Sequence, residues 1–202
     1  MNLKWILSFF FALISHPCFA DQLDFKVEKF KGKVTFQNSK INSGDIIKQS
    51  GVIETGKGSF VKLSFGEGSG SLTLGPSSSL DLKSVVLDPS SSSLAVTLKN
   101  GVIRWVGKHK ELGRLKGILT PQAALGVRGT DFVLKTTELF DESEIVVLDG
   151  LVSFENLANP NDKASVKKGQ WGGVGGRFGQ INGKILDLPK KILDHFDRTL
   201  KL

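Results

Sequence analysis

Cysteine is nearly absent from this sequence of 202 residues, whose only one, Cys18, lies close to the N-terminus. A disulfide requires two cysteines, and thiolate chemistry requires one that remains in the folded protein. We expect Cys18 to be removed with a leader peptide, for the reasons given next. The mature protein is therefore predicted to use neither disulfides nor thiolate chemistry.

Long apolar runs are also scarce, and after the N-terminus none reaches the length that crosses a bilayer. The N-terminus itself has Lys4, an apolar run over 5–14 and the small-x-small triplet 18–20. This order is typical of a secretory signal peptide, here over 1–20, with Asp21 as the expected first residue of the mature chain. We expect an exported protein, in the periplasm or secreted, without a transmembrane segment after cleavage.

Two alternatives to a cleaved signal peptide fit the N-terminus less well. The first is a membrane anchor, but the apolar run is short and ends at His16 and Pro17. The second is a lipoprotein with the lipid on Cys18. His16 and Pro17 are bulky, however, where a lipidation site requires small residues.

Motifs for catalysis and for metal binding are missing as well. The segment 51–58, GVIETGKG, approaches a phosphate-binding loop, but Gly58 replaces the hydroxyl residue and the pattern indicates a following strand rather than a helix. The segment 65–71, FGEGSGS, lacks the spacing of a nucleophile elbow and is read as a hairpin loop. His109 and His195 have no ligand-spaced partners nearby. We expect no enzyme, no cofactor and no metal.

Positive charge is in excess, with 27 Lys and Arg against 20 Asp and Glu. A basic exported protein can meet anionic polymers, phospholipid head groups or acidic proteins, whereas nucleic acid is not its expected partner. Four basic residues gather within 107–117 and form a candidate patch for an anionic polymer: Lys108, Lys110, Arg114 and Lys116.

Short segments of alternating apolar residues dominate the chain and predict an all-β fold. The clearest predicted strands are 60–65, 94–98, 144–148 and 151–154. We expect stacked short strands and hairpins in a solenoid-like or sandwich-like arrangement. The dipeptides Asn100-Gly101 and Asp149-Gly150 predict two-residue hairpin turns with positive φ.

The segments between and after these strands are predicted to be loops and one helix. Polar or basic stretches predict loops at 88–93, 107–117 and 156–165, and the glycine-rich stretch 169–183 predicts an irregular segment or a tight strand connection. Near the C-terminus, Pro189 suits the first turn of a helix, and one helical face is apolar, with Ile192, Leu193, Phe196 and Leu200. We expect this helix to cover the β domain, the alternative being a membrane-surface helix. The chain is therefore predicted to consist of a signal peptide (1–20), a β domain (21–170), and a glycine-rich segment with the C-terminal amphipathic helix (171–202).

Several segments, in this order, resemble the FecR domain, the periplasmic β-rich domain of iron-citrate-type sigma regulators. They are residues 51–82, the string LKNGVIRWV that contains Trp105, the signature TPQAALGVRGTDF over 120–132, EIVVLDGLVSF, and VKKGQW. The resemblance extends over roughly 44–169. In the best-known members an anti-sigma domain and a transmembrane helix precede this domain, whereas here a signal peptide is expected. The resemblance implies a β module used for interaction.

Arg128 lies within the signature, in an otherwise apolar stretch next to Gly129 and Thr130. One interpretation is a structural role, in which its guanidinium binds carbonyls or an acid such as Asp131 and locks a turn. The other is a binding role, in which it anchors a carboxylate or phosphate of a partner. We take Arg128, Gly129, Thr130 and Trp105 as candidate structural or partner-binding residues.

The sequence therefore predicts a non-catalytic exported interaction module. Its expected partner is another envelope protein, and its expected role is envelope signalling or regulation. One alternative is a structural envelope protein that binds anionic cell-wall glycan or lipopolysaccharide. A less favoured one is an enzyme that acts on a wall polymer. The sequence does not predict the oligomeric state.

Overall fold

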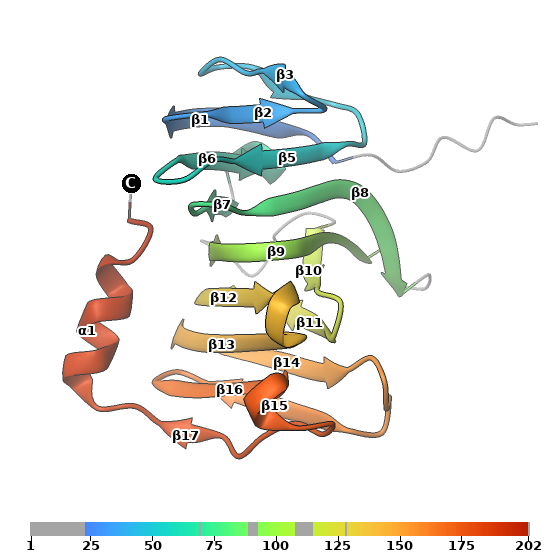
Figure 1. Cartoon of the computed structure of the whole chain (residues 1–202), viewed down its shortest axis with the longest axis vertical. Coiled ribbons are helices and arrows are strands. Elements are labelled where there is room, and N and C mark those ends of the chain that lie inside the picture. The colour runs from blue at the N-terminus through green and yellow to red at the C-terminus, as the bar shows by residue number, and fades with distance from the viewer. Residues whose placement is uncertain (1–22, 69, 89–92, 108–114, 128, 202) are drawn as a thin grey trace, which may run out of the picture.

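The computed structural model of the chain describes residues 23–68, 70–88, 93–107, 115–127 and 129–201. In these residues 17 strands form one open sheet, and a single α-helix, α1 (Lys190–Arg198), runs beside it (Figure 1). β9 and β10 pair in parallel and the other strand pairs are antiparallel, so the sheet is mixed. The predicted all-β fold with a short C-terminal helix is confirmed.

The long strand β9 (Ser93–Gly107) joins two ladders of strands. Ladder A contains, in spatial order, β4 (Ile46–Ile47), β1 (Phe25–Lys31), β6 (Phe60–Phe65), β7 (Gly70–Leu74), the second half of β9, β12 (Asp131–Thr137), β13 (Glu142–Asp149), β16 (Gln170–Gly175) and β17 (Leu186–Asp187). Ladder B contains β3 (Ser39–Lys40), β2 (Val34–Phe36), β5 (Val52–Thr55), β8 (Ser79–Asp88), the first half of β9, β10 (Leu115–Leu119), β11 (Ala123–Val127), β14 (Leu151–Asn156) and β15 (Lys163–Lys167). Three short 3-10 turns complete the described structure: η1 (Gly66–Gly68), η2 (Glu138–Phe140) and η3 (Gly176–Phe178).

The hydrophobic core lies between the two ladders, since one cluster of buried side chains includes residues from both. The period-two pattern of the strands produces it, because alternate residues point to the same face. In β6, for example, Val61, Leu63 and Phe65 are buried. Phe65 and Phe132 pack on either side of Trp105, with ring centroids 5.0 and 6.0 Å from its own. We call the two ladders and their core the stack.

The predicted strands over 60–65, 94–98, 144–148 and 151–154 all lie within observed strands. The strand, turn and strand predicted around 51–58 are confirmed as β5, a turn and β6, and the predicted hairpin loop after 60–65 is confirmed as η1 between β6 and β7. Period-two patterning and glycine positions were sufficient here because these elements are local in sequence.

Both predicted two-residue hairpins are wrong: they are corners at which the chain passes between the ladders. Up to Asn100 β9 pairs with β8, and from Gly101 onward it pairs with β7 and β12. Likewise β13 pairs with β12 and β16, whereas β14, which follows Gly150, pairs with β11 and β15. The predicted positive φ is confirmed, at 102° for Gly101 and 85° for Gly150. A corner between layers requires the same backbone freedom as a hairpin, so the dipeptide alone does not distinguish them.

Two predicted irregular segments contain strands. Within 169–183 the chain forms β16, because a Cβ at Gly173 would lie 2.5 Å from the Ser143 carbonyl oxygen and glycine alone permits this approach to β13. The loop predicted over 107–117 is wrong at its end, where β10 begins at the buried Leu115. The rest of that loop, 108–114, lies outside the described residues.

The predicted C-terminal helix is confirmed as α1, with Pro189 directly before its first residue. In Figure 1 it lies along the side of the stack, beyond the strands of ladder A. Among the residues that the structure describes, no helix combines the length and the apolar character that spanning a bilayer requires.

Candidate functional site

An open groove of about 970 Å³ runs along the stack where the chain turns between the ladders. Its walls come from the β1–β2 turn, β5 and the turn after it, the β7–β8 connection, the β9 corner, the β10–β11 turn and η2. We call it the corner groove. The charged residues that line it are Lys33, Glu54, Lys57, Lys99, Glu138 and Asp141.

The floor of the corner groove is polar, and its hydrogen bonds are satisfied within the fold. The Thr55 hydroxyl donates to the carbonyl of Gly75 at 2.5 Å and accepts from the backbone N–H of Ser78 at 3.0 Å. The Ser78 hydroxyl in turn accepts from the backbone N–H of Val102 at 3.0 Å. Buried polar groups that are all paired hold one arrangement, so the floor is a rigid base.

The signature residues Thr120 and Gln122 form a second network at one end of the groove. The Ser143 hydroxyl lies 2.8 Å from the Thr120 hydroxyl and 2.6 Å from the Gln122 side-chain oxygen, to which Thr136 also donates. The side-chain amide of Gln122 donates to Asp141 at 2.5 Å. The signature therefore has a structural use here: it fixes the end of η2.

The turn η2 holds two large apolar side chains in solvent beside the groove. Leu139 is 83% exposed and Phe140 is 63% exposed. The backbone N–H of Glu138 donates to Asn100 at 3.2 Å, and Asp141 closes the turn in the left-handed conformation. A Cβ at Gly175 would lie 2.0 Å from the Asp141 carbonyl, so a glycine is required beneath the turn. We call Leu139 and Phe140 the apolar tip.

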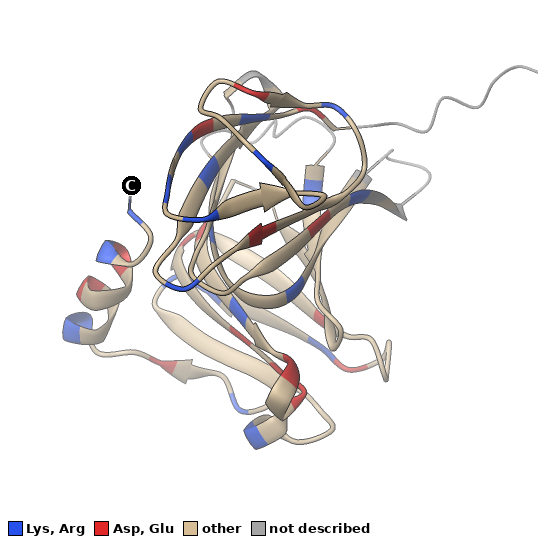
Figure 2. Cartoon of the chain, turned by 45° about the horizontal axis from the view of Figure 1, so that its top comes forward, with Lys and Arg blue, Asp and Glu red and all other residues tan. Residues whose placement is uncertain are grey.

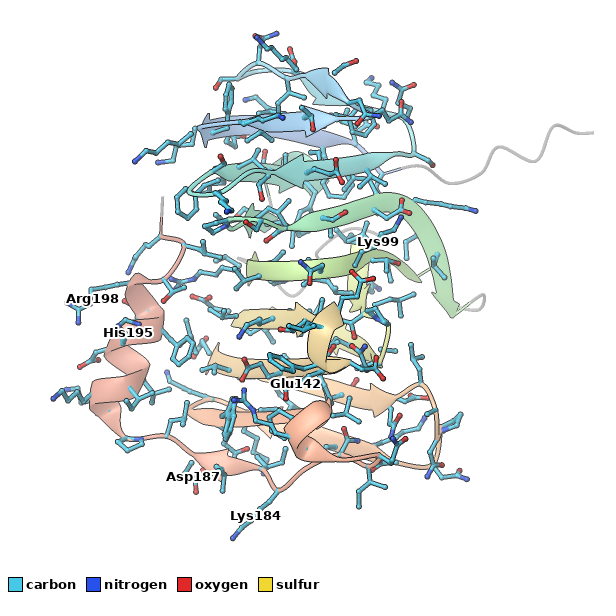
Figure 3. The ribbon with its side chains drawn as sticks, in the orientation of Figure 1. Lys99, Glu142, Lys184, Asp187, His195 and Arg198 are labelled. Atoms are coloured by element: carbon cyan, nitrogen blue, oxygen red, sulfur yellow. The ribbon has the colours of Figure 1, made fainter. Side chains whose placement is uncertain are left out.

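Charge around the groove is mixed. Figure 2 shows the positions of acidic and basic residues interspersed over the strands, and Figure 3 labels Lys99 on β9. Lys99 pairs with Asp81 at 3.0 Å. Burial opposes ionisation of Asp81, but the N–H of Lys83 and the Lys99 ammonium outweigh it and hold the pKa of Asp81 below its usual value. A groove of mixed charge can bind a polar segment of another protein, and apolar residues beside the groove can add a central apolar contact.

The structure places three of the predicted site residues away from the corner groove. Trp105 is fully buried in the core, and Thr130 is 1% exposed. The Trp105 indole N–H and the Thr130 hydroxyl have no hydrogen-bond partner among the described residues. Gly129 has a positive φ of 58°, at the entry to β12.

The predicted charged site residues divide into those outside and those within the described part of the chain. Arg128, Lys108, Lys110 and Arg114 lie outside the described residues, and Lys116 is exposed on β10. Asp131, which one interpretation gave to Arg128, binds Arg104.

Arg104 is a residue that sequence reasoning missed. Its side chain is 5% exposed, and it donates to both Asp131 carboxylate oxygens at 3.0 and 2.7 Å. It also contacts Asp197, which lies in the last turn of α1. Burial acts to lower the pKa of Arg104, but the hydrogen bonds and charges of Asp131 and Asp197 outweigh it and raise that pKa above its ordinary value. The available signal was an arginine in the apolar run VIRWV, the same feature that singled out Arg128.

The fold and the groove together define a class of protein: an all-β domain with an open sheet and an open groove at its corners. Among the described residues, no group of three His, Cys, Asp or Glu side chains is arranged to hold a metal ion. The chain belongs to the FecR family, since the family model described as FecR protein matches residues 51–153. This family is regulatory, which supports a role in regulatory signalling and implies protein partners.

Solved structures share this fold. Two crystal structures are described as a "putative anti-sigma factor" from Parabacteroides distasonis ATCC 8503. The first has a TM-score of 0.56 at 16% identity, over 75% of this chain and 66% of that chain. The second has a TM-score of 0.54 at 15% identity, over 73% and 65%. At this identity the likeness shows the fold alone, and this chain spans just under two thirds of either neighbour. No curated protein matches the sequence.

Proposed function

We propose that this chain is an exported, non-catalytic regulatory protein of the cell envelope, in the periplasm or secreted, that binds another envelope protein through the corner groove. The FecR match over 51–153 carries the proposal, because most walls of the groove and the whole of η2 fall within it. The expected signal peptide over 1–20 supports the export.

The apolar tip supports protein binding at this place. Burying Leu139 and Phe140 against a partner would remove apolar surface from water, which contributes about 25 cal/mol per Å² to the free energy of binding. The tip is held by hydrogen bonds and by a required glycine, so little conformational entropy is lost on binding. An ordered, exposed apolar pair beside a polar groove is typical of an interaction site.

A photo-crosslinking amino acid at position 139, in cells that make the full chain, tests the proposal. We expect one discrete protein adduct at position 139 and none at position 151, where Leu151 is 50% exposed on β14 outside the groove. Phe140→Ser should abolish the adduct with little change in the melting temperature, because Phe140 is 63% exposed and does not belong to the core cluster.

Equal adducts at both positions would contradict binding at the groove. If the protein instead remains on isolated cell wall or lipopolysaccharide and is released by salt, the glycan-binding alternative is favoured. Mass spectrometry of the same preparation tests export: the mature N-terminus is expected at Asp21.

A further inference from the structure

A second surface, separate from the corner groove, lies on the outer face of ladder A beneath α1. There Arg104 on β9, Val133 on β12 and Val146 on β13 occupy successive register positions across the strands. The side chains of all three are covered, with residue exposures of 4%, 4% and 3%. Val133 and Val146 are not part of the core cluster, so they are buried on the other side of the sheet. We call this row the strap face, and residues 188–201 the strap.

The strap covers this face without burying any residue of its own helix. No residue of α1 is buried, and Leu193 and Phe196 are half-buried. Figure 3 shows Arg198 on the side of α1 that points away from the strands. The far end of the strap reaches β7, where the Leu200 side chain lies close to Gly75. The strap is therefore a shallow cover, in contrast to the strands below it.

Arg104 donates hydrogen bonds to the C-terminal end of α1. One terminal nitrogen donates to the carbonyls of Asp197 and Thr199, at 2.5 and 3.1 Å, and the other approaches the Asp197 carboxylate at 3.2 Å. The last carbonyls of a helix have no partner within it, and that end carries a partial negative charge. A buried guanidinium therefore matches a helix C-terminus in charge and in hydrogen-bonding geometry.

This contact can be broken without leaving a buried charge unpaired. Arg104 is held by Asp131 through two hydrogen bonds that do not involve the strap. Asp197 would retain Lys201, whose ammonium lies 3.0 Å away on the strap itself. Departure of α1 thus exposes Val133, Val146 and the open side of Arg104, and both ionic groups stay paired.

We propose that the strap face is a receptor for helix C-termini, that α1 occupies it in the free protein, and that a partner's helix takes the place of α1. The partner is a protein whose amphipathic helix ends at this face. Its last turn carries an acidic residue for Arg104, as Asp197 does in α1, and it carries apolar residues one position and one turn before that residue to cover the two valines. In α1 these two positions hold the half-buried Phe196 and Leu193. The receptor is formed by the stack, and the strap acts as its internal competitor.

The test uses the full chain and a fluorescein-labelled peptide of residues 186–202, with binding followed by fluorescence anisotropy. Asp197→Arg in the chain places a positive charge against Arg104 and should release the strap, while the peptide keeps its aspartate. We expect the variant to bind the peptide roughly tenfold more tightly than the parent chain, equivalent to about 1.4 kcal/mol. Asp194→Arg is the matched control, since it makes the same charge change at an exposed position of α1 and should leave affinity as in the parent.

A peptide that itself carries Asp197→Arg should bind neither chain. Hydrogen exchange of α1 in the Asp197→Arg chain completes the test. If α1 exchanges rapidly and the peptide still binds no better than to the parent, the strap face is not a receptor. If α1 stays protected, Arg104 does not hold the strap. Either result would overturn the proposal.

Discussion

Arg104 and Trp105 are neighbours on β9 that point to opposite faces of the sheet, and they represent two regions held in different ways. Trp105 is fully buried between Phe65 and Phe132 in the stack, where packing and apolar burial dominate. Arg104 binds the strap through polar contacts at one end of a helix that buries none of its residues. The stack is therefore expected to behave as one cooperative unit, and the strap as an attachment that opens at lower cost.

The largest expected effect is in the core of the stack. Trp105→Ala should lower the free energy of unfolding by about 3–5 kcal/mol, because it leaves a cavity among packed aromatic rings. Chemical denaturation of the variant measures it. Ile192→Ala on the strap is the matched comparison and should change stability by less than about 0.5 kcal/mol, since Ile192 is 42% exposed. Equal losses in the two variants would remove the distinction between stack and strap.

The second-largest loss of stability is expected from substitutions at the corners of the stack, where the chain passes between the ladders. Gly101→Val should cost on the order of 3 kcal/mol, because a β-branched residue at positive φ is strained and its Cβ would lie 2.0 Å from the Ser78 hydroxyl. Gly150→Val should also destabilise, against Thr130. Gly58→Ala separates the two causes: its φ is 64° with nothing near its Cβ, so only strain of about 1 kcal/mol is expected. If thermal melts show equal losses of melting temperature for Gly58→Ala and Gly101→Val, steric crowding at the Gly101 corner does not contribute to the loss.

Arg104 connects the two regions, so its removal affects both. Arg104→Ala should lower the free energy of unfolding by about 1–3 kcal/mol, because Asp131 loses both hydrogen bonds, and it should release the strap as well. Arg104→Lys should retain part of the stability yet still release the strap, since a point charge cannot donate to Asp131 and to α1 together. Denaturation curves together with hydrogen exchange of α1 distinguish these effects, and a protected α1 in both variants would contradict them.

The smallest expected effect is the response of the strap to acid. A hydrogen bond from Lys201 and then one from Arg104 hold the pKa of Asp197 below its ordinary value of 3.8. The contribution of the ionised carboxylate is therefore present above pH 3.8 and is lost as the pH falls through the lower folded pKa. The groups facing Asp197 are Arg104 from β9, which is paired with Asp131 of β12, and Lys201 from the strap.

Spin labels on the strap and on the stack measure this release. Label pairs at His195→Cys and Ser153→Cys, with Cys18 replaced by serine, should show the strap moving away from the stack only at acidic pH. The same pair in an Asp197→Asn background should show no acid step attributable to this residue. An unchanged acid step in that background would assign the effect to another group.

Much of the stack was predictable from the sequence, because period-two patterning depends on each strand alone. The dipeptides Asn100-Gly101 and Asp149-Gly150 predicted the positive φ of their glycines correctly and the topology incorrectly. A turn dipeptide specifies local φ, whereas the partner of the next strand depends on residues elsewhere in the chain. The glycine-rich segment shows the same limit, since Gly173 is required by the carbonyl of Ser143 and not by its neighbours in sequence.

The candidate site was harder to predict, because six segments far apart in sequence assemble the corner groove. Many of its residues lie in the segments 51–82, 98–106 and 120–132, which had been singled out, but none of them had been predicted as a site residue. Leu139 and Phe140 stood in what reads as a polar turn. The strap contact illustrates the difficulty most clearly, since Arg104 and Asp197 are 93 positions apart. An arginine in an apolar run was a usable signal, but the sequence contains two, and Arg128 was the one selected.

Native-state hydrogen exchange on the full Asp197→Arg chain compares the stack and the strap most directly. The amides of α1 should exchange close to their unstructured rates, while those of β9 and β12 keep the protection that they have in the parent chain. Asp194→Arg should leave both regions protected. If β9 and β12 lose protection together with α1, the stack and the strap open as one unit, and the strap is part of the folded core rather than a removable cover.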